Sequence, residues 1–496
     1  MLLKNLINNL PEDKKKIEIK GLSVNSKDIK KGYIFFAIKG SKHNGEKYIE
    51  EAINKGASVI VSSNNFTHKN KKIFNIKKKN IRNFVSEVSA KFYKIKPKNI
   101  ITVTGTNGKT SVADLFYQLL SLNNIPVASI GTLGIKYNNK IVKTGLTSPD
   151  TISIHRHLQN LKKNKIDNVI IEASSHGLHQ DRLHHINFKA AIFTNFSQDH
   201  LDYHKTMRAY LNAKLILFKK ILKKNSNIVL DKTVKQFNFL KKIAVKRNLK
   251  LIEISKIIEK INNINLNTDI DFKVKNLAMA IAAAKLCGLK DSEIYELLKE
   301  VKDVDGRLEL SKRFTNNVKV FIDYAHTPDA LMKTLQSLEK KYGKNISLVF
   351  GCGGERDKKK RPLMAKVANN FSRKIYVTDD NPRNEDPKKI RNELVKKIDK
   401  KKCFNIGNRA EAIKKSIINS EPNGVVLIAG KGHEVQQIYK DKIFNISDKQ
   451  IVRNLQLRIK TLSKKDQNYH QNRIIIKKIL GITKSGNYEG LKIDSR

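Results

Sequence analysis

The 496-residue sequence has few cysteines, few prolines and no long apolar run, and each shortage excludes a class of protein. The three cysteines, Cys287, Cys352 and Cys403, lie far apart without a CxxC pair, which excludes a disulfide framework and a cysteine zinc site. This pattern fits a reducing compartment, so we expect a cytoplasmic protein. Nine prolines and 24 glycines exclude a collagen-like composition. No apolar run reaches the roughly 18 residues of a membrane helix, so no membrane span is expected.

Acidic residues are also scarce, with 46 Asp and Glu against 98 Lys and Arg, which gives a formal net charge of +52. A large positive charge can indicate nucleic acid or acidic substrates as partners. Here the lysines are spread along the whole chain together with many asparagines and isoleucines, which favours a compositional bias over a binding patch. A general attraction for anionic ligands and nucleic-acid binding remain as alternatives, and we expect no nucleic-acid partner.

Apolar residues make up 40% of the chain, enough for several cores, and the length suggests about three domains. We expect a small α/β domain over residues 1–98, a central domain over 99–307, a third domain over 308–462, and a tail over 463–496. Short apolar runs alternate with helical patterns throughout. This alternation predicts an α/β fold with mainly parallel sheets covered on both faces.

The sequence predicts particular strands and helices in each domain. In the first domain we expect strands at 34–38 and 58–62 around a helix at 48–55. In the central domain we expect strands at 100–104, 127–130, 168–172 and 190–194, with an amphipathic helix from about 109. Residues 231–270 are rich in Lys and Asn, and their order is left open. In the third domain, strands at 319–323, 346–350, 374–378 and 425–428 alternate with helices at about 328–341, 361–371, 387–400 and 408–419, a Rossmann-like pattern.

The strongest local motif is TGTNGKTS at 104–111, between a strand and a helix. Backbone N–H groups of such a turn, with the helix N-terminus, can cradle a triphosphate, while Lys109 reaches the phosphates and the Thr110 hydroxyl binds Mg²⁺. The full GxxxxGK[ST] pattern needs Gly at position 103, where this chain has Val103, so the match is to a shorter variant. An ordinary glycine turn is the alternative interpretation.

A second cluster, between residues 155 and 204, holds eight of the thirteen histidines. Glu172 ends a predicted parallel strand, where side chains face the ligand crevice, and a carboxylate there suits Mg²⁺. Zinc bound by His200 and His204 is one alternative, although the pair lacks the Glu of HExxH and a cysteine partner. Purely structural histidines are another.

In the third domain, four polar loops follow four predicted strands: DYAHTP at 323–328, GCGGERD at 351–357, DDNPR at 379–383 and AGKGHE at 429–434. Any one of them could be plain turn chemistry. Because carboxyl ends of parallel strands meet at one edge of a sheet, we expect the four loops to converge on one site.

These motifs, with EASSHG at 172–177 and FTNFSQDHLDYH at 193–204, resemble the Mur ligases, ATP-dependent amide ligases of peptidoglycan synthesis. The resemblance covers about residues 20–460. It implies three domains: a small N-terminal α/β UDP-binding domain, a central P-loop-type ATPase domain and a C-terminal Rossmann-like domain. It further implies, as an expectation, the addition of meso-2,6-diaminopimelate to UDP-N-acetylmuramoyl-L-alanyl-D-glutamate. ATP then phosphorylates a D-Glu carboxylate, and the incoming amine attacks the acyl phosphate to give an amide.

The resemblance also implies roles for individual residues. ATP is bound by Gly105, Thr106, Asn107, Gly108, Lys109, Thr110, Ser111, Asn276 and Arg307. Catalysis involves Lys109 together with the Mg²⁺ sphere of Thr110, Glu172, His200 and Lys214, a lysine that matches one carbamylated in this family. The UDP-sugar and peptide contacts are Val24, Ser26, Ser41, Lys42, His43, Thr147, Ser148, Ser174, Gln180 and Arg182. The amino-acid pocket is formed by Arg356, Asp380, Asn381, Pro382, Arg383, Gly430 and Glu434.

The amino-acid pocket carries the specificity argument. Diaminopimelate differs from lysine by one extra distal carboxylate, and an arginine fork binds a carboxylate in bidentate fashion. Arg383 therefore favours diaminopimelate, while Glu434 can hold the distal ammonium. A ligase that adds lysine or another amino acid, a folylpolyglutamate synthase-like enzyme, a nucleic-acid-stimulated NTPase and a non-catalytic nucleotide-binding module remain as alternatives. We expect a monomer that acts on small molecules, with ATP and Mg²⁺.

The tail begins polar, and its last heptad, GLKIDSR at 490–496, resembles GLSVNSK at 21–27 with three of seven positions identical. By the same resemblance, residues 21–27 open the UDP-binding domain. We therefore expect the tail to be the start of a second, fused Mur ligase, the one that adds D-Ala-D-Ala. A C-terminal helix docked on the third domain is the alternative.

Overall fold

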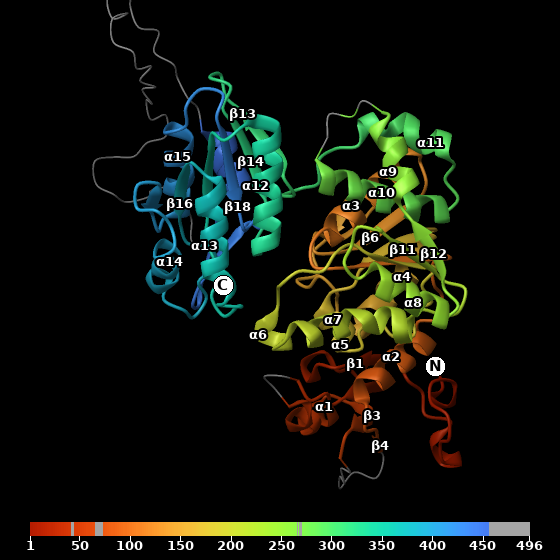
Figure 1. Ribbon diagram of the computed structural model, residues 1–496. Coiled ribbons are helices and arrows are strands. Elements are labelled where there is room, and N and C mark those ends of the chain that lie inside the picture. The colour runs from red at the N-terminus through yellow and green to blue at the C-terminus, as the bar shows by residue number, and fades with distance from the viewer. Residues whose placement is uncertain (41–43, 65–72, 265, 267–269, 456–496) are drawn as a thin grey trace, which may run out of the picture. The chain divides into compact units, whose positions relative to one another are not determined.

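The structure is a computed structural model that describes residues 1–40, 44–64, 73–264, 266 and 270–455. The chain divides into two compact units, with unit 1 spanning Met1–Lys302 and unit 2 beginning at Asp303. Unit 1 contains a four-stranded and an eight-stranded sheet, and unit 2 contains a six-stranded sheet and a two-stranded hairpin (Figure 1). The fold class expected from the sequence is confirmed, whereas the ranges 1–98, 99–307 and 308–462 stay predictions. The expected tail lies outside the described residues.

The small sheet of unit 1 is parallel throughout, in the order β1-β2-β3-β4. Its elements are β1 (Gly21–Ser23), β2 (Tyr33–Phe36), β3 (Ala57–Ser62), β4 (Phe74–Lys77), α1 (Ile49–Asn54) and α2 (Ile81–Phe92), with 3₁₀ turns at Leu3–Asn5, Glu12–Lys14, Ser26–Asp28 and Gly45–Tyr48. Side chains alternate along β2: Ile34 and Phe36 join the cluster that contains α2, and Phe35 joins the one that contains α1. Both faces of the sheet are therefore buried, as the apolar runs indicated.

The small sheet is anchored to the rest of unit 1 through α2. This helix packs on α4 (Thr151–Lys163), whose Ile152 belongs to the core of the small sheet. The Ser86 hydroxyl donates to the His184 carbonyl (2.5 Å), and the Asn83 amide lies 2.9 Å from His184 Nδ1. Apolar and polar contacts together hold the two sheets of unit 1 in one body.

The large sheet of unit 1 has the order β12-β11-β10-β5-β9-β6-β7-β8, with parallel pairing from β12 to β6 and antiparallel pairing beyond. Its strands are β5 (Asn99–Thr104), β6 (Val127–Gly131), β7 (Gly134–Tyr137), β8 (Lys140–Val142), β9 (Asn168–Glu172), β10 (Ala190–Phe193), β11 (Asn227–Leu230) and β12 (Lys250–Glu253). β5, β9 and β10 are buried over their whole length. A strand buried on both faces reads as a continuous apolar run, which is why the sequence predicted these three.

Helices cover both faces of this sheet (Figure 1). They are α3 (Lys109–Leu122), α4, α5 (Ser175–His179), α6 (Leu201–His204), α7 (Met207–Ile216) with a π-helical turn at Leu217–Ile221, α8 (Phe237–Lys246), α9 (Ser255–Asn262), α10 (Asp271–Leu286), α11 (Asp291–Glu296) and a 3₁₀ turn at Leu297–Glu300. α3 packs on α10, whose buried face is rich in alanine, and small side chains let the two helices approach closely. The segment 231–270, whose order was left open, contains α8, β12 and α9.

The sheet of unit 2 has the order β13-β14-β18-β15-β16-β17, and only its β13–β14 pairing is antiparallel in the described chain. The strands are β13 (Glu309–Arg313), β14 (Lys319–Asp323), β15 (Ile346–Phe350), β16 (Lys374–Val377), β17 (Cys403–Asn405) and β18 (Val425–Ala429), with the hairpin β19 (Gln436–Tyr439) and β20 (Lys442–Asn445). The helices are α12 (Pro328–Tyr342), α13 (Lys360–Phe371), α14 (Pro387–Val395), α15 (Arg409–Ile418) and α16 (Asp448–Asn454). Strand β18 returns to the middle of the sheet, between β14 and β15.

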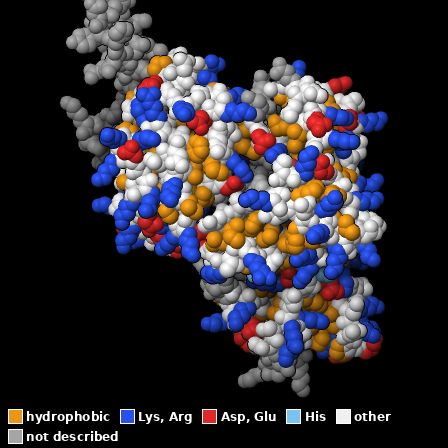
Figure 2. Space-filling model, viewed as in Figure 1, with side chains coloured by type: hydrophobic (Ala, Val, Ile, Leu, Met, Phe, Trp, Pro, Cys, Tyr) orange, Lys and Arg blue, Asp and Glu red, His pale blue; other side chains and the backbone are white. Residues whose placement is uncertain are grey.

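Element boundaries are where the sequence predictions were least accurate. The helix expected over 387–400 ends at Val395, and turns follow in which Asp399 N donates to the Asn369 side chain (3.0 Å). Short or exposed strands such as β8, β13, β17 and the β19–β20 hairpin were not predicted, because they lack a continuous apolar run. In the described part of the chain, no helix is both long and apolar enough to cross a membrane. Lys and Arg side chains are scattered over the face shown in Figure 2, which agrees with a compositional bias.

The contact between α4 and the segment before β5 makes unit 1 sensitive to acid. His155 is fully buried, with Lys96 Nζ 2.9 Å from its Nδ1, and burial lowers the pKa of His155 to about 3. An unfolded chain protonates this histidine below about pH 6.5, whereas the folded chain does not, so stability falls as the pH drops from 6.5 toward 3. We expect a loss of about 2 kcal/mol at pH 5.

Melting of the wild type and of His155→Gln at pH 7 and pH 5 measures this loss. The variant should lose less stability than the wild type between the two pH values. An equal acid shift in both proteins contradicts the assignment to His155.

Candidate active site

The loop between β5 and α3 has a shape that requires glycine. Gly105 (φ +148°) and Gly108 (φ +87°) occupy backbone conformations that side chains rarely adopt. A Cβ on Gly105 would lie 1.9 Å from Thr194 Oγ1, and one on Gly108 would lie 2.6 Å from Asn276 Oδ1. The loop is therefore packed against the segment after β10 on one side and against α10 on the other, which places Asn276 beside the expected nucleotide-binding residues.

The segment after β10 holds the loop in place. Asn107 N donates to Asn195 Oδ1 (2.9 Å), Thr106 N donates to the Asn195 carbonyl (2.9 Å), and Thr194 Oγ1 donates to the Asn107 carbonyl (2.6 Å). Because β10 and β5 are neighbours in the sheet, these bonds join two segments that end at the same edge. The loop is thus preformed, as a phosphate cradle needs to be.

Lys109 and Thr110 occupy the first turn of α3, and Ser111 follows them. The Lys109 ammonium lies over the loop and donates to the carbonyls of Gly105 (3.1 Å) and Thr106 (2.9 Å). Thr110 Oγ1 donates to Glu172 Oε2 (3.0 Å). A cation, a hydroxyl and a helix N-terminus therefore meet at the loop, an arrangement that suits a polyphosphate.

Glu172 is 1% exposed and ends β9, the neighbour of β5. Its Oε1 accepts from Thr132 N (2.8 Å), and its Oε2 accepts from Thr132 Oγ1 (3.1 Å) as well as from Thr110. A carboxylate and a hydroxyl in direct contact are the oxygen ligands that Mg²⁺ prefers. The expected pair Thr110 and Glu172 is thus brought together by the sheet.

His200 and Lys214 approach the same loop from the segment after β10. His200 has φ +54° and its N donates to Asp199 Oδ1 (2.8 Å); burial lowers the pKa of His200 to about 3 despite the Asp199 carboxylate. Lys214 is 1% exposed, and its Nζ donates to the Gly105 carbonyl (2.6 Å). The same Nζ lies 4.5 Å from the Tyr210 ring centroid. Burial, followed by the charge of Lys109, lowers the pKa of Lys214 well below its usual value. Asp199, which is buried and affects the pKa of both residues, lies in the motif at 193–204, but the sequence analysis gave it no role of its own.

The zinc alternative is left without a ligand set. Among the described residues, no group of three or more His, Cys, Asp and Glu side chains is arranged to hold a metal ion. His204 is buried, with its Nε2 3.0 Å from Ser175 Oγ, so it takes part in packing. Mg²⁺ often takes only one or two protein carboxylates and fills its sphere with phosphates and water, so the residues present fit Mg²⁺ better than zinc.

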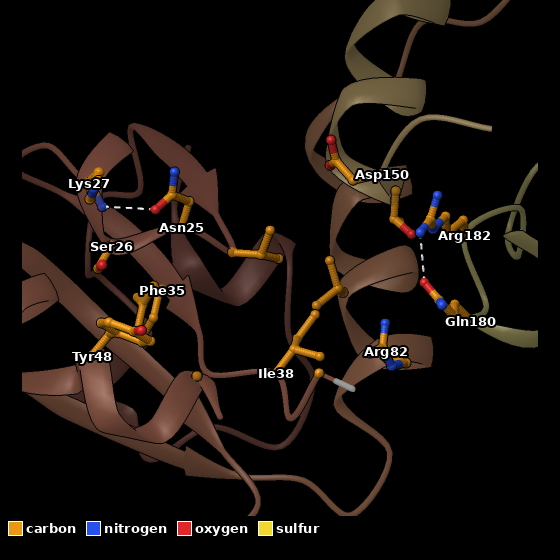
Figure 3. A pocket seen from close by; sticks show the side chains of 15 residues that line it. Asn25, Ser26, Lys27, Phe35, Ile38, Tyr48, Arg82, Asp150, Gln180 and Arg182 are labelled. Carbon is orange, nitrogen blue, oxygen red and sulfur yellow. Dashed lines mark hydrogen bonds between the residues drawn. The ribbon is translucent and has the colours of Figure 1, made fainter. Parts of the chain in front are cut away.

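A cavity of about 450 Å³ lies in unit 1 between the small sheet with α2 on one side and the start of α4 and the segment after α5 on the other (Figure 3). Four of the residues expected to bind the UDP-substrate line it: Val24, Ser26, Gln180 and Arg182. Arg82, Tyr48, Phe35 and Asp150 also line the cavity and were not predicted, because single side chains on helices and strands carry no motif. Arg82 and Arg182 add positive charge, which suits a diphosphate ligand.

Ser148 connects this cavity to the phosphate-loop region. Arg182 Nη1 donates to the Ser148 carbonyl (2.6 Å), and Ser148 Oγ donates to the Glu172 carbonyl (2.7 Å). Ser174 N donates to Ser148 Oγ (3.0 Å), and Thr147 Oγ1 lies 3.0 Å from Thr132 Oγ1. The expected contacts Thr147, Ser148 and Ser174 therefore form one network with Glu172. Ser41, Lys42 and His43 lie outside the described residues.

In unit 2, the four loops that follow β14, β15, β16 and β18 contact one another. Gly430 N donates to the Asp323 carbonyl (3.1 Å), Gly354 N donates to the Asn381 carbonyl (2.9 Å), and Asn381 Nδ2 donates to Glu434 Oε2 (2.9 Å). The predicted convergence of the loops is thus present, because these strands are neighbours and parallel.

Arg383 connects its own loop, after β16, to the loop after β15 and to strand β19. It has φ +54°, its N donates to the Ile438 carbonyl (3.0 Å), and its Nη1 donates to the Gly354 carbonyl (2.7 Å). Burial and the charge of exposed Arg356 lower the pKa of Arg383. In the described chain its recorded hydrogen bonds involve Nη1 of the guanidinium, so the rest of the fork can take a ligand carboxylate.

The remaining predicted pocket residues support this cluster. Asp380 Oδ1 accepts from Asn381 N (2.7 Å), and the Pro382 carbonyl lies 1.9 Å from the position of a Cβ on Gly354. The Arg307 guanidinium lies 4.2 Å from the Tyr324 ring centroid, with Nη1 3.3 Å from His433 Nδ1. Arg307 therefore contacts the loop after β18, while its expected role toward ATP stays a prediction.

A P-loop-type phosphate site joined to a Rossmann-like unit defines a nucleotide-dependent enzyme. Three family models match this chain: "Mur ligase family, catalytic domain" over residues 18–93, "Mur ligase middle domain" over 103–281, and "Mur ligase, glutamate ligase domain" over 306–432. Together they cover most of the chain, and the chain belongs to the Mur ligase family.

Individual relatives agree with the family models. A UDP-N-acetylmuramoyl-L-alanyl-D-glutamate--2,6-diaminopimelate ligase of Rickettsia montanensis is 41% identical over 463 residues, covering 88% of this chain and 95% of the relative. The solved structure of an enzyme with the same name matches with a TM-score of 0.63 and 27% identity, covering 91% of this chain and 98% of its own. A MurF ligase of Thermotoga maritima in complex with ADP shares the fold, with a TM-score of 0.53 and 16% identity over 83% of this chain and 94% of its own. The expected family and the expected class of ADP-forming ligase are confirmed.

The phosphate loop generates a first test of the site. Lys109→Ala removes the ammonium that lies over the loop, so we expect the rate at saturating ATP to fall by about 10²-fold or more. The melting temperature should stay near that of the wild type, since Lys109 is only half-buried.

Product formation and thermal melting measure the two effects. Lys163→Ala, an exposed lysine on α4, is the matched control and should leave both unchanged. A Lys109→Ala enzyme that keeps more than about a tenth of its rate contradicts the charge-stabilising role.

Proposed function

We propose that this Mur ligase adds meso-2,6-diaminopimelate to UDP-N-acetylmuramoyl-L-alanyl-D-glutamate, with ATP converted to ADP and phosphate, in peptidoglycan precursor synthesis. The names of its relatives agree with this assignment. The observation that carries it is the cluster in unit 2, where Asn381 donates to Glu434 and Arg383 donates to the Gly354 carbonyl of the loop after β15. A carboxylate and a guanidinium in one cluster are what an amino acid with an extra ammonium and carboxylate requires.

The reaction proceeds in two bond-forming steps. A carboxylate oxygen of the D-Glu residue attacks the γ-phosphorus of ATP, the bond to the β-phosphate oxygen breaks, and ADP leaves. The neutral amine of the incoming amino acid then attacks the acyl carbon, phosphate leaves with its oxygen, and the amine proton goes to solvent or a nearby base. Lys109 and the N–H groups of the phosphate loop stabilise the negative charge on the transferred phosphoryl group.

When it is bound, Mg²⁺ supplies positive charge between the D-Glu carboxylate and the phosphates of ATP. Four residues would hold it: Thr110, Glu172, His200 and Lys214. Thr110 and Glu172 are in contact with each other, and His200 and Lys214 follow β10 in the chain and approach the same loop. The UDP-substrate would occupy the cavity of Figure 3, where Arg82 and Arg182 offset its diphosphate charge. We assign the reaction to a monomer in the cytoplasm, where ATP is available.

Lys214 has the properties of a lysine that becomes carbamylated. Carbamate formation needs a neutral amine, which attacks the carbon of CO₂ and loses a proton. Burial lowers the pKa of the Lys214 amine and so favours that form. The product carries a negative charge, which offsets the cost of burial beside Lys109 and a metal ion. A carbamate also supplies an oxygen ligand that suits Mg²⁺.

We expect ¹³C NMR of the wild type in ¹³C-bicarbonate to show one carbamate signal that disappears in Lys214→Arg, whose guanidinium stays protonated. Activity should be lost in the same variant, since its side chain cannot become a metal ligand. Lys219→Arg, at an exposed position in the next helical turn, should keep both signal and activity. A crystal structure with substrates in which Lys214 is an unmodified ammonium would rule the carbamate out.

The choice of amino acid depends on Arg383. Arg383→Ala should weaken the use of diaminopimelate by roughly 2–4 kcal/mol, as for a buried charge-assisted pair that loses one partner. The use of lysine should hardly change, because lysine lacks the distal carboxylate. Steady-state kcat/KM for both amino acids measures the difference, with Arg373→Ala, in an exposed pair with Glu421, as the control. Equal losses for both amino acids would show that Arg383 positions the loop instead.

The proposed function itself is tested by ligation with the purified protein. UDP-muramoyl-dipeptide, ATP and Mg²⁺ are supplied with diaminopimelate or lysine, and the tripeptide product and ADP are quantified. We expect diaminopimelate to be strongly preferred. Ligation of lysine at an equal rate would assign the chain to the lysine-adding alternative, and no product with either would contradict the function.

A further inference from the structure

Lys431, in the loop after β18, is a wholly buried lysine of the AGKGHE motif to which the sequence analysis gave no role. Its side chain is 0% exposed, although it lies in a loop that faces the amino-acid pocket. Its Nζ donates to three oxygens: the Gln436 carbonyl, Glu434 Oε2 (3.3 Å) and Asn381 Oδ1 (3.4 Å). Lys431 therefore joins three segments, namely its own loop, the loop after β16 and the start of β19.

Burying an ammonium is costly unless its charge is paired and its donors are satisfied. Here the compensating charge is the carboxylate of Glu434, whose side chain is 32% exposed. In the proposed function, this carboxylate binds the distal ammonium of the incoming amino acid. An apolar residue at position 431 would avoid the desolvation cost. The presence of a lysine there therefore points to a role beyond packing.

The three contacts fix the orientation of two pocket groups. Glu434 Oε2 accepts from both Lys431 Nζ and Asn381 Nδ2 (2.9 Å), while the described residues give no recorded hydrogen bond to Oε1. Asn381 Oδ1 accepts from Lys431 and from Ile438 N (3.0 Å), so the amide cannot rotate without losing these bonds. Glu434 is thus held by one oxygen, and the other is available to a ligand.

We propose that Lys431 is a positioning residue for the distal ammonium of the incoming amino acid. It holds Oε2 of Glu434 and the amide of Asn381 before binding, so that Oε1 of Glu434 meets the ligand without a loss of side-chain freedom. The inference rests on the proposed function, since it assumes that Glu434 binds the amino acid. Lys431 does not touch the substrate in this arrangement and acts through Glu434.

The kinetic test uses Lys431→Met, which keeps the length and loses the charge and donors. We expect KM for diaminopimelate to rise by about tenfold or more, with kcat and the KM values for ATP and UDP-muramoyl-dipeptide within about twofold. Glu434→Gln and the double variant complete a cycle: if Lys431 acts through Glu434, the double variant is no worse than Glu434→Gln. Lys442→Met, an exposed lysine on β20, should have no effect.

Three outcomes overturn the proposal. The first is a double variant whose rise in KM equals the product of the rises in the two single variants. The others are a fall in kcat of Lys431→Met with KM unchanged, and equal rises in KM for all three substrates. If Lys431→Met does not fold, Lys431→Gln, which keeps one donor, is judged by the same criteria. A crystal structure of the variant gives a second readout that does not depend on turnover. In that structure the Glu434 carboxylate should move away from Asn381, and an unmoved carboxylate refutes the positioning role. This readout is separate from the proposed function, which is contradicted if the wild type ligates neither diaminopimelate nor lysine.

Discussion

A parallel sheet that is covered on both faces can expose polar groups only at the ends of its strands. In both units this constraint gathers the chemistry at carboxyl ends: β5, β9 and β10 lead into the phosphate loop, Glu172 and its bracing segment, and β14, β15, β16 and β18 lead into the four loops of unit 2. The strands are held by apolar burial, so the loops inherit a fixed spacing. The residues proposed for these loops depend on that spacing.

Buried cations show how the surroundings decide the role of a side chain. Arg409 is fully buried and pairs with Asp448 through two bonds of 2.8 and 2.7 Å, while its Nη2 donates to the Ala429 carbonyl (3.0 Å) and so supports the end of β18. Lys214 donates to a backbone carbonyl and has a strongly lowered pKa, and the proposed carbamate rests on these two properties. Lys431 shares the carboxylate of Glu434, which makes it a means of orienting that group. The three buried cations differ in their hydrogen-bond partners and in the charges around them, and their roles differ accordingly.

Prediction from the sequence succeeded where the signal was local. Continuous apolar runs identified the central strands, a glycine-bearing motif identified the phosphate loop, and polar motifs after strands identified the four loops of unit 2. It failed for Arg82, which lies in no motif, and it gave no role to Asp199 and Lys431, although the motifs at 193–204 and 429–434 contain them. In a protein with 98 lysines and arginines, one functional cation is hidden among solvated ones. Only burial and contacts separate it from them.

The sequence by itself determined the alternation of strands and helices, the phosphate-binding turn and the family, because periodicity and short motifs are properties of neighbouring residues. Tertiary structure alone decided which side chains share a site. Lys431 meets Asn381, fifty positions earlier, and Lys214 meets Gly105, more than a hundred positions earlier, since strand order brings those segments to one sheet edge. Strand order, burial and the pKa shifts that burial causes arise from packing over long sequence separations, which no local pattern records.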